Sequence, residues 1–318
     1  MMLRARFFIL ALASLLLTSA CEPDPGEQQG QPPQTSVSIE RTGFLKADKL
    51  LEASGLQASH SREGDFFVHN DEGPPRIYAI NEKGANLGHI SILPAKNKDW
   101  EDLASVPVED GRWLVAGDIG DNMARRKYIK LYFIEEPKPG KNDRYKGDSD
   151  LKHWLTLSYP DGPRDCEAMA YDPVGDRILL ISKRDKPPRL YSIDLQTALT
   201  EQNVELTFLG TMLRLRRPTP ADRAQFGGRT DFISQPTGFD ISPDGNEAVV
   251  LTYRSIYHFR REAGEDWVSA LQGKPLEVVG PTAPQNEGIT YSTDGRAVYV
   301  TTEKIPAPVF RVQFLDGE

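Results

Sequence analysis

Five short motifs in the 318-residue chain carry a polar side chain followed by a small or acidic residue and then an apolar one. The motifs are ASGLQAS (53–59), WEDLASVP (100–107), CEAMAYDP (166–173), PTGFDISPDG (236–245) and NEGITYSTDG (286–295), and their polar residues are Ser54, Glu101, Glu167, Thr237 and Glu287. Carboxylates and hydroxyls are the hard oxygen ligands that Ca²⁺ prefers, whereas Zn²⁺ would favour His and Cys. Because three carboxylates brought together repel one another, we expect the five side chains to bind a central calcium ion. The alternative is that they hydrogen bond to water and to strand ends.

A second group of charged residues has the types needed to activate water and to bind an anion. The candidate catalytic carboxylates lie in HNDEG (69–73) and GDIGDN (117–122) and are Asp71, Asp118 and Asp121. The candidate cations for an anionic substrate group are Arg125, Arg164, Lys183, Arg184 and Arg254. A carboxylate can act as a general base, and Arg and Lys pair with anionic oxygen. GDIGDN is also typical of a tight turn in which Asp and Asn side chains bond their own backbone.

The elements that must position these residues are short strands. Each motif precedes a second β-rich segment, namely DFFVHND, RWLVAGDIGDN, RILLISKR, EAVVLTYR or AVYVTTE, then a third, and in most units a fourth. Three or four strands per unit with turns between them indicate a β-propeller blade, so five units predict an all-β, five-bladed β-propeller. The last unit lacks an outer strand, which VSIERTGFL (37–45) can supply by closing the ring. A six-bladed ring or two separate domains is the competing interpretation.

Propeller geometry would bring both groups of residues to one face of the ring. The innermost strand of every blade starts at the same face, beside the central channel, and the second strand ends there. We therefore expect the five motif residues to converge on the channel and the second group to form its rim.

The first residues have the pattern of an export signal. Arg4 and Arg6 precede an apolar run and small residues before Cys21, which predicts a signal peptide (1–20) and lipidation of Cys21. An ordinary cleaved signal with an incidental cysteine is the alternative. The Pro- and Gln-rich segment 21–36 is expected to be a flexible tether, and 37–318 the propeller domain. The predicted location is the bacterial cell envelope.

Composition excludes several classes of protein. The formal net charge of −8 argues against a nucleic-acid binder, which needs a basic surface. No G-x-S-x-G, H-E-x-x-H, P-loop or dinucleotide fingerprint occurs. Cys21 and Cys166 are the only cysteines, so no internal disulfide is expected beside the lipid anchor. We expect a monomer whose partners are a small anionic substrate or ligand and a membrane.

The order of the motifs resembles that of the calcium-activated nucleotidases (soluble apyrases). The resemblance rests on the Ser before Leu in the first motif, the Glu before a hydrophobic-Ala step in the second, CEAMA, TGFD and NEGI. It implies a five-bladed propeller with one channel calcium, ligated by Ser54, Glu101, Glu167 and Glu287, with Thr237 at the remaining blade's position. Where that family has two Asp and an Arg after the first blade's second strand, this chain has His69, Asn70 and Asp71. DWEDLA with GDIGDN also resembles bacterial propeller lipoproteins of unassigned activity.

Two functions from different classes fit this sequence. The first is a calcium-dependent hydrolase of a small, phosphoester-like anion. The second is a non-catalytic, calcium-stabilised binding scaffold of the cell envelope. Acid and base residues on one face favour the hydrolase, and the departure at 69–71 favours the scaffold.

The anchoring hypothesis predicts that Cys21→Ser moves the protein from the membrane fraction to the soluble exported fraction, because the acceptor thiol for the lipid is lost. Fractionation and immunoblotting measure this. A substituted protein that stays with the membrane, without accumulation of the unprocessed form, would show that the lipoprotein assignment is wrong.

Overall fold

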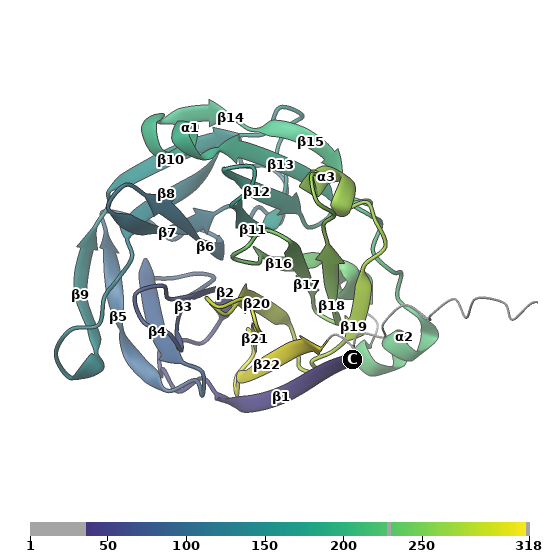
Figure 1. The fold of residues 1–318 in the computed structure, drawn as a ribbon, viewed down its shortest axis with the longest axis horizontal. Coiled ribbons are helices and arrows are strands. Elements are labelled where there is room, and N and C mark those ends of the chain that lie inside the picture. Colours follow the sequence, from purple (N-terminus) through teal and green to yellow (C-terminus); the bar gives the residue numbers. More distant parts are fainter. Residues whose placement is uncertain (1–35, 228–229, 316–318) are drawn as a thin grey trace, which may run out of the picture.

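The computed structural model describes residues 36–227 and 230–315, and within them the strands form five sheets around a common centre (Figure 1). The five-bladed β-propeller predicted from the motifs is confirmed, and five sheets exclude the six-bladed alternative. No helix in this part of the chain has the length and apolar character needed to cross a membrane. The predicted signal peptide (1–20), Cys21 and the tether up to residue 35 lie outside the described residues.

The blades follow one another along the chain. The first contains β2 (Ala53–Ala58), β3 (Asp65–Asn70), β4 (Arg76–Asn81), β5 (Asn86–Leu93) and β9 (Tyr145–Asp150). The second contains β6 (Trp100–Val108), β7 (Gly111–Asp118), β8 (Ile129–Glu135), β10 (His153–Ser158) and β14 (Asn203–Glu205). The third contains β11 (Cys166–Asp172), β12 (Arg177–Ser182), β13 (Arg189–Asp194) and β15 (Thr207–Thr211).

The last two blades complete the ring. The fourth contains β16 (Pro236–Ile241), β17 (Glu247–Thr252), β18 (Ser255–Arg260) and β19 (Leu276–Val279). The fifth contains β20 (Asn286–Tyr291), β21 (Val298–Thr302), β22 (Pro308–Leu315) and β1 (Ser36–Phe44). The short helices lie in the connections and are η1 (Lys141–Asp143), α1 (Leu195–Thr200), α2 (Pro220–Phe226), η2 (Thr230–Ser234) and α3 (Trp267–Ala270).

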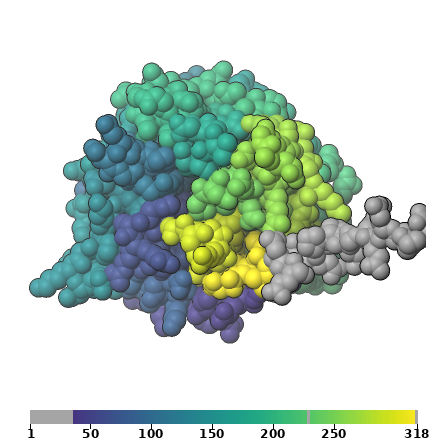
Figure 2. Space-filling view, in the orientation of Figure 1, coloured from purple at the N-terminus to yellow at the C-terminus, as the bar shows by residue number. Residues whose placement is uncertain are grey.

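The N-terminal strand closes the ring as predicted. β1 pairs antiparallel with β22, from Ser36 opposite Leu315 to Phe44 opposite Pro308. In the space-filling view, the purple and yellow ends of the described chain accordingly lie side by side (Figure 2). The pairing covers the edge that β22 would otherwise expose.

Two outer strands come from a neighbouring unit of the chain, which the sequence pattern did not indicate. β9 follows η1 and pairs in parallel with β5 of the first blade, and β14 pairs in parallel with β10 of the second. Each therefore links two consecutive blades through backbone hydrogen bonds.

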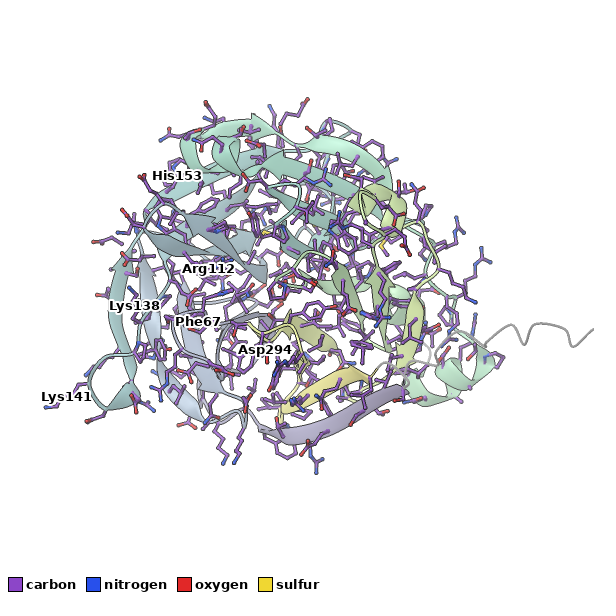
Figure 3. All side chains as sticks on the ribbon, in the orientation of Figure 1. Phe67, Arg112, Lys138, Lys141, His153 and Asp294 are labelled. Atoms are coloured by element: carbon purple, nitrogen blue, oxygen red, sulfur yellow. The ribbon has the colours of Figure 1, made fainter. Side chains whose placement is uncertain are left out.

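Apolar side chains fill the spaces between neighbouring blades. Five buried clusters each join residues of two adjacent sheets; one contains Phe67 and Trp100, and another Val115 and Met169. Figure 3 shows side chains throughout the ring, with Asp294 near its middle and Lys141 on a peripheral loop. Burial of these clusters is the main force that holds the blades at a fixed angle to the channel.

Closure by β1 predicts a difference between two truncations. A chain starting at residue 36 should keep its Tm and stay monomeric, whereas one starting at residue 46 should lose roughly 5 °C or more and self-associate, because the β22 edge is uncovered and about 1 kcal/mol corresponds to about 2–4 °C in large domains. Calorimetry and light scattering measure both. Equal Tm and equal mass for the two truncations would contradict closure by β1.

Candidate functional site

A β-bulge lies near the start of every innermost strand. The register shifts lie between Ser54 and Leu56, Trp100 and Asp102, Cys166 and Ala168, Pro236 and Gly238, and Asn286 and Gly288. A bulge opposes two residues to one and re-aims a side chain. In four blades the residue without a cross-strand partner is the predicted site residue itself, namely Glu101, Glu167, Thr237 or Glu287. The local fold therefore presents a polar side chain from a strand that is otherwise packed in the core.

Two of the five predicted ligands are hydroxyls that bridge neighbouring blades. Ser54 Oγ donates to the carbonyl oxygen of Glu101 at 2.9 Å. Thr237 Oγ1 donates to the carbonyl oxygen of Asn286 at 2.7 Å. Both side chains are buried. These bonds are of the kind expected if polar motif residues satisfy strand ends, and metal ligation by Ser54 and Thr237 stays a prediction.

Lys183 directly follows β12 and interacts with the three glutamates of the predicted ring. Its Nζ pairs with Glu167 Oε2, and it attracts Glu287 and Glu101. It lies 5.3 Å from the centre of the Tyr253 ring and is only 5% exposed. The sequence predicts Lys183 on an open rim, but in the structure its side chain is buried and forms an ion pair with Glu167.

Burial raises the pKa of the glutamates around Lys183. The pKa of Glu101 and that of Glu287 both lie well above their usual range, first because of desolvation. The Lys183 ammonium works in the opposite direction on both groups. Glu287 Oε2 is a buried oxygen without a hydrogen-bond partner in the described chain. The Lys183 ammonium therefore offsets only part of the cost of burying these glutamates as carboxylates.

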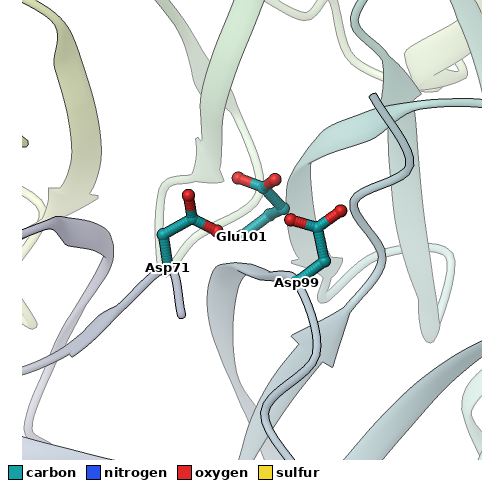
Figure 4. Close-up of side chains that lie close together, drawn as sticks. All are labelled: Asp71, Asp99 and Glu101. Carbon is teal, nitrogen blue, oxygen red and sulfur yellow. The ribbon is translucent and has the colours of Figure 1, made fainter. Parts of the chain in front are cut away.

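Asp71, Asp99 and Glu101 form a tighter group, which we call the acidic cluster. One oxygen from each carboxylate lies within 4.8 Å of the other two, and in Figure 4 the three side chains point toward one another. Burial, followed by the charge of Asp99, raises the pKa of Asp71 to about 7, and burial also raises that of Asp99. Asp71 Oδ1 is buried without a hydrogen-bond partner among the described residues. The structure thus brings Asp71 and Glu101 from the two predicted groups together and adds Asp99.

The GDIGDN loop packs directly against the acidic cluster at Gly120. The Gly120 N–H donates to the carbonyl oxygen of Asp99 at 3.1 Å. A Cβ atom on Gly120 would lie 2.7 Å from Asp99 Oδ2, so a larger residue here would displace the Asp99 carboxylate. The glycine therefore allows the close approach of the loop to the carboxylates in this arrangement.

Asp118 and Asp121 are buried and bonded within this loop. Arg126 Nη2 lies 2.6 Å from Asp118 Oδ1, and the Arg126 backbone N–H donates to Asp121 Oδ2 at 2.5 Å. The Asp121 N–H donates to Asp165 Oδ1 at 2.9 Å. Of these contacts, only the bond from the Arg126 backbone to Asp121 is of the kind expected in a turn where Asp side chains bond nearby backbone, and catalytic roles for the two aspartates stay predictions.

The remaining predicted cations lie in different surroundings. Arg125 is exposed, and Arg164 pairs with Asp161 at 3.2 Å. Arg184 Nε lies 2.6 Å from Asp165 Oδ2, beside the GDIGDN loop. Arg254 is buried, and its guanidinium donates to internal acceptors that include Tyr257 and Glu277. Of the five predicted cations, Lys183 contacts Glu167 and Arg184 contacts Asp165.

Asp99 and Arg126 are not among the predicted site residues, although DWEDLA contains Asp99 and Arg126 follows the predicted Arg125. Asp99 stands two residues before Glu101 in DWEDLA. A second carboxylate so close to a predicted ligand, just before an inner strand, was the signal that could have identified it. Arg126 lies next to the predicted Arg125, but only the folded loop shows which of the two turns inward.

Comparison with protein families and with curated proteins finds no match. Among solved structures, a luciferin-regenerating enzyme is 11% identical, with 89% of this chain and 98% of that chain covered and a TM-score of 0.47. The Cps50 (Swd1) β-propeller domain of Myceliophteria thermophila is 12% identical, with 86% and 99% covered and a TM-score of 0.44. At these values the likeness says nothing about function, and the five-bladed architecture rests on the sheets described above.

The raised pKa of Asp71 predicts how stability depends on pH in the presence of EDTA. Because the folded state binds this proton more tightly than the unfolded state, the carboxyl should cost stability as pH rises from about 4 to about 7. Asp71→Asn should flatten this part of the Tm profile, whereas Asp110→Asn, on an exposed turn, should not. Thermal unfolding between pH 4 and pH 8 measures the slopes. Identical profiles for all three proteins would contradict the assigned environment of Asp71.

Proposed function

We propose that the acidic cluster binds a divalent cation, with calcium as the first candidate, and that the protein is a metal-dependent hydrolase of a small anionic substrate. The observation that carries the proposal is the convergence of three carboxylates within 4.8 Å, one of which has a buried oxygen without a hydrogen-bond partner. Mutual repulsion in a partly desolvated site disfavours this arrangement unless protons or a cation offset it.

The donor set of the acidic cluster fits calcium. All three side chains offer carboxylate oxygen, the type of ligand that Ca²⁺ takes, and backbone carbonyls or water can complete six to eight ligands. Asp71 Oδ1 has a free acceptor site, and the absent side chain of Gly120 leaves room beside Asp99. A site on the channel axis fits less well, because the Lys183 ammonium already interacts with all three glutamates there.

The chemistry that follows assigns different tasks to the residues. A bound cation would polarise the substrate and lower the pKa of a water molecule. Glu287 lies outside the acidic cluster, and its raised pKa and unpartnered Oε2 suit it to hold a proton. Lys183 and Arg184 supply positive charge beside the carboxylates, which would lower the cost of bringing an anion to an acidic site.

A phosphoester is our first choice of substrate. This choice rests on the resemblance of the motifs to the calcium-activated nucleotidases, and the location at the cell envelope rests on the pattern before Cys21. Both remain part of the proposal.

The non-catalytic scaffold is the second candidate. It is favoured because charged groups already pair with one another inside the protein. The Arg126 guanidinium pairs with Asp118, the Arg126 backbone N–H donates to Asp121, and Lys183 pairs with Glu167. In that case the cation would stabilise the channel mouth and the face would bind a ligand.

Full-length protein in detergent, assayed on phosphoesters, phosphoanhydrides and glycosides, should show turnover that needs calcium. Asp99→Asn should lower it by at least about 100-fold, since even outer partners of a metal contribute about 10–100-fold. Asp110→Asn, on an exposed turn, is the matched control. Calcium binding measured by calorimetry without turnover on any substrate would support the scaffold. Full turnover in EDTA, or in Asp99→Asn, would contradict the proposed centre.

A further inference from the structure

A cavity of about 340 Å³ lies between the loop after β12 and the long insertion that joins β15 to β16. Its lining includes Lys183 and Lys186 from the loop, and Arg214, Arg217 and Arg223 from the insertion. The acidic residues of the lining are Asp185 and Asp231. We call this cavity the basic pocket. Its volume is in the range of small-molecule sites, of about 300–1,000 Å³.

The insertion is held in place by a partly buried ion network. Thr219 and Asp222 form a capping box at the start of α2, which lies at the edge of the fourth blade in Figure 1. Asp222 Oδ2 lies 3.0 Å from Arg216 Nη1 and 3.3 Å from Arg254 Nη1. Glu277 of β19 accepts from Arg216 at 3.0 Å. Arg254, predicted to bind substrate, therefore anchors the wall of the pocket instead.

This network neutralises Arg216 and Arg254, and it does not include the other cations that line the pocket. Lys186, Arg217 and Arg223 form no ion pair with any residue in the described ranges 36–227 and 230–315, and Arg214 donates to the carbonyl oxygen of Lys186 at 3.0 Å. Of the two acids, Asp185 already lies near Arg164 and Arg189, at 3.8 and 3.6 Å. The pocket thus concentrates positive charge in a chain whose formal net charge is −8.

We propose that the basic pocket binds a small, multiply charged oxyanion, either a phosphoryl group or a di- or tricarboxylate. Arg and Lys side chains form charge-assisted hydrogen bonds with both. Lys183 both lines the pocket and pairs with Glu167, so it forms the wall between the pocket and the channel mouth. An anion in the pocket therefore lies beside Lys183, whose charge also acts on Glu101 of the acidic cluster. A role for this link in turnover rests on the proposed function, whereas anion binding itself does not.

The test is calorimetric titration of full-length protein that has been stripped of metal with EDTA and then dialysed free of it, in detergent and low salt, with inorganic phosphate and with citrate as separate probes. We expect saturable binding of at least one probe, weakened about tenfold or more by Arg217→Ala and by Arg223→Ala, and weakened by salt. Arg296→Ala is the matched control, because Arg296 is exposed and outside the pocket. Which probe binds more tightly identifies the anionic group. No binding of either probe, or equal weakening by Arg296→Ala, would overturn the proposal.

Asp99→Asn separates this inference from the proposed function. If the pocket binds the anion independently of the metal, Asp99→Asn keeps phosphate or citrate affinity even where it abolishes turnover. Turnover that needs Asp99 together with wild-type anion affinity in Arg217→Ala and Arg223→Ala would leave the hydrolase standing and overturn the pocket. Thermal unfolding of each variant confirms that it is folded.

Discussion

Repulsion among buried carboxylates at the channel mouth is the constraint on which the rest of the site depends. Glu101, Glu167 and Glu287 come from three blades, and burial raises the pKa of each. Lys183 supplies one positive charge against these three acids. One ammonium cannot balance them together with Asp71 and Asp99, which adjoin Glu101. Protons or a second cation must offset the remaining charge, and this need is the physical basis for the proposed metal centre.

The propeller creates this crowding through features that repeat in every blade. In four blades the bulge in the inner strand falls on a polar site residue, and in the first blade it falls on Gly55. The clusters between blades fix the strands around the channel. The same packing makes the site rigid, because a shift of one inner strand would disturb two interblade cores. Loops then make the blades differ. GDIGDN brings Gly120 against Asp99, and the insertion before β16 builds the basic pocket beside Lys183.

The number of blades and the closing strand could be predicted because they depend on a local pattern that repeats five times. The same pattern identified Glu101, Glu167 and Glu287. Other features could not be predicted, because they depend on tertiary contacts. β9 and β14 pair in parallel with strands of the preceding unit, and no local periodicity encodes that choice. Asp99 joins Glu101 only where the chain bends before β6, and the inward direction of Lys183 depends on the charges that surround it.

The measurement that tests the central claim most directly is the position of the metal in crystals grown with calcium or with manganese as an anomalous scatterer. The account predicts an anomalous difference peak for the metal at about 2.3–2.6 Å from carboxylate oxygens of Asp71, Asp99 and Glu101. The ion pair between Lys183 and Glu167 should remain intact. A peak on the channel axis among Glu101, Glu167 and Glu287, with Lys183 displaced, would contradict it, as would the absence of any peak at saturating metal.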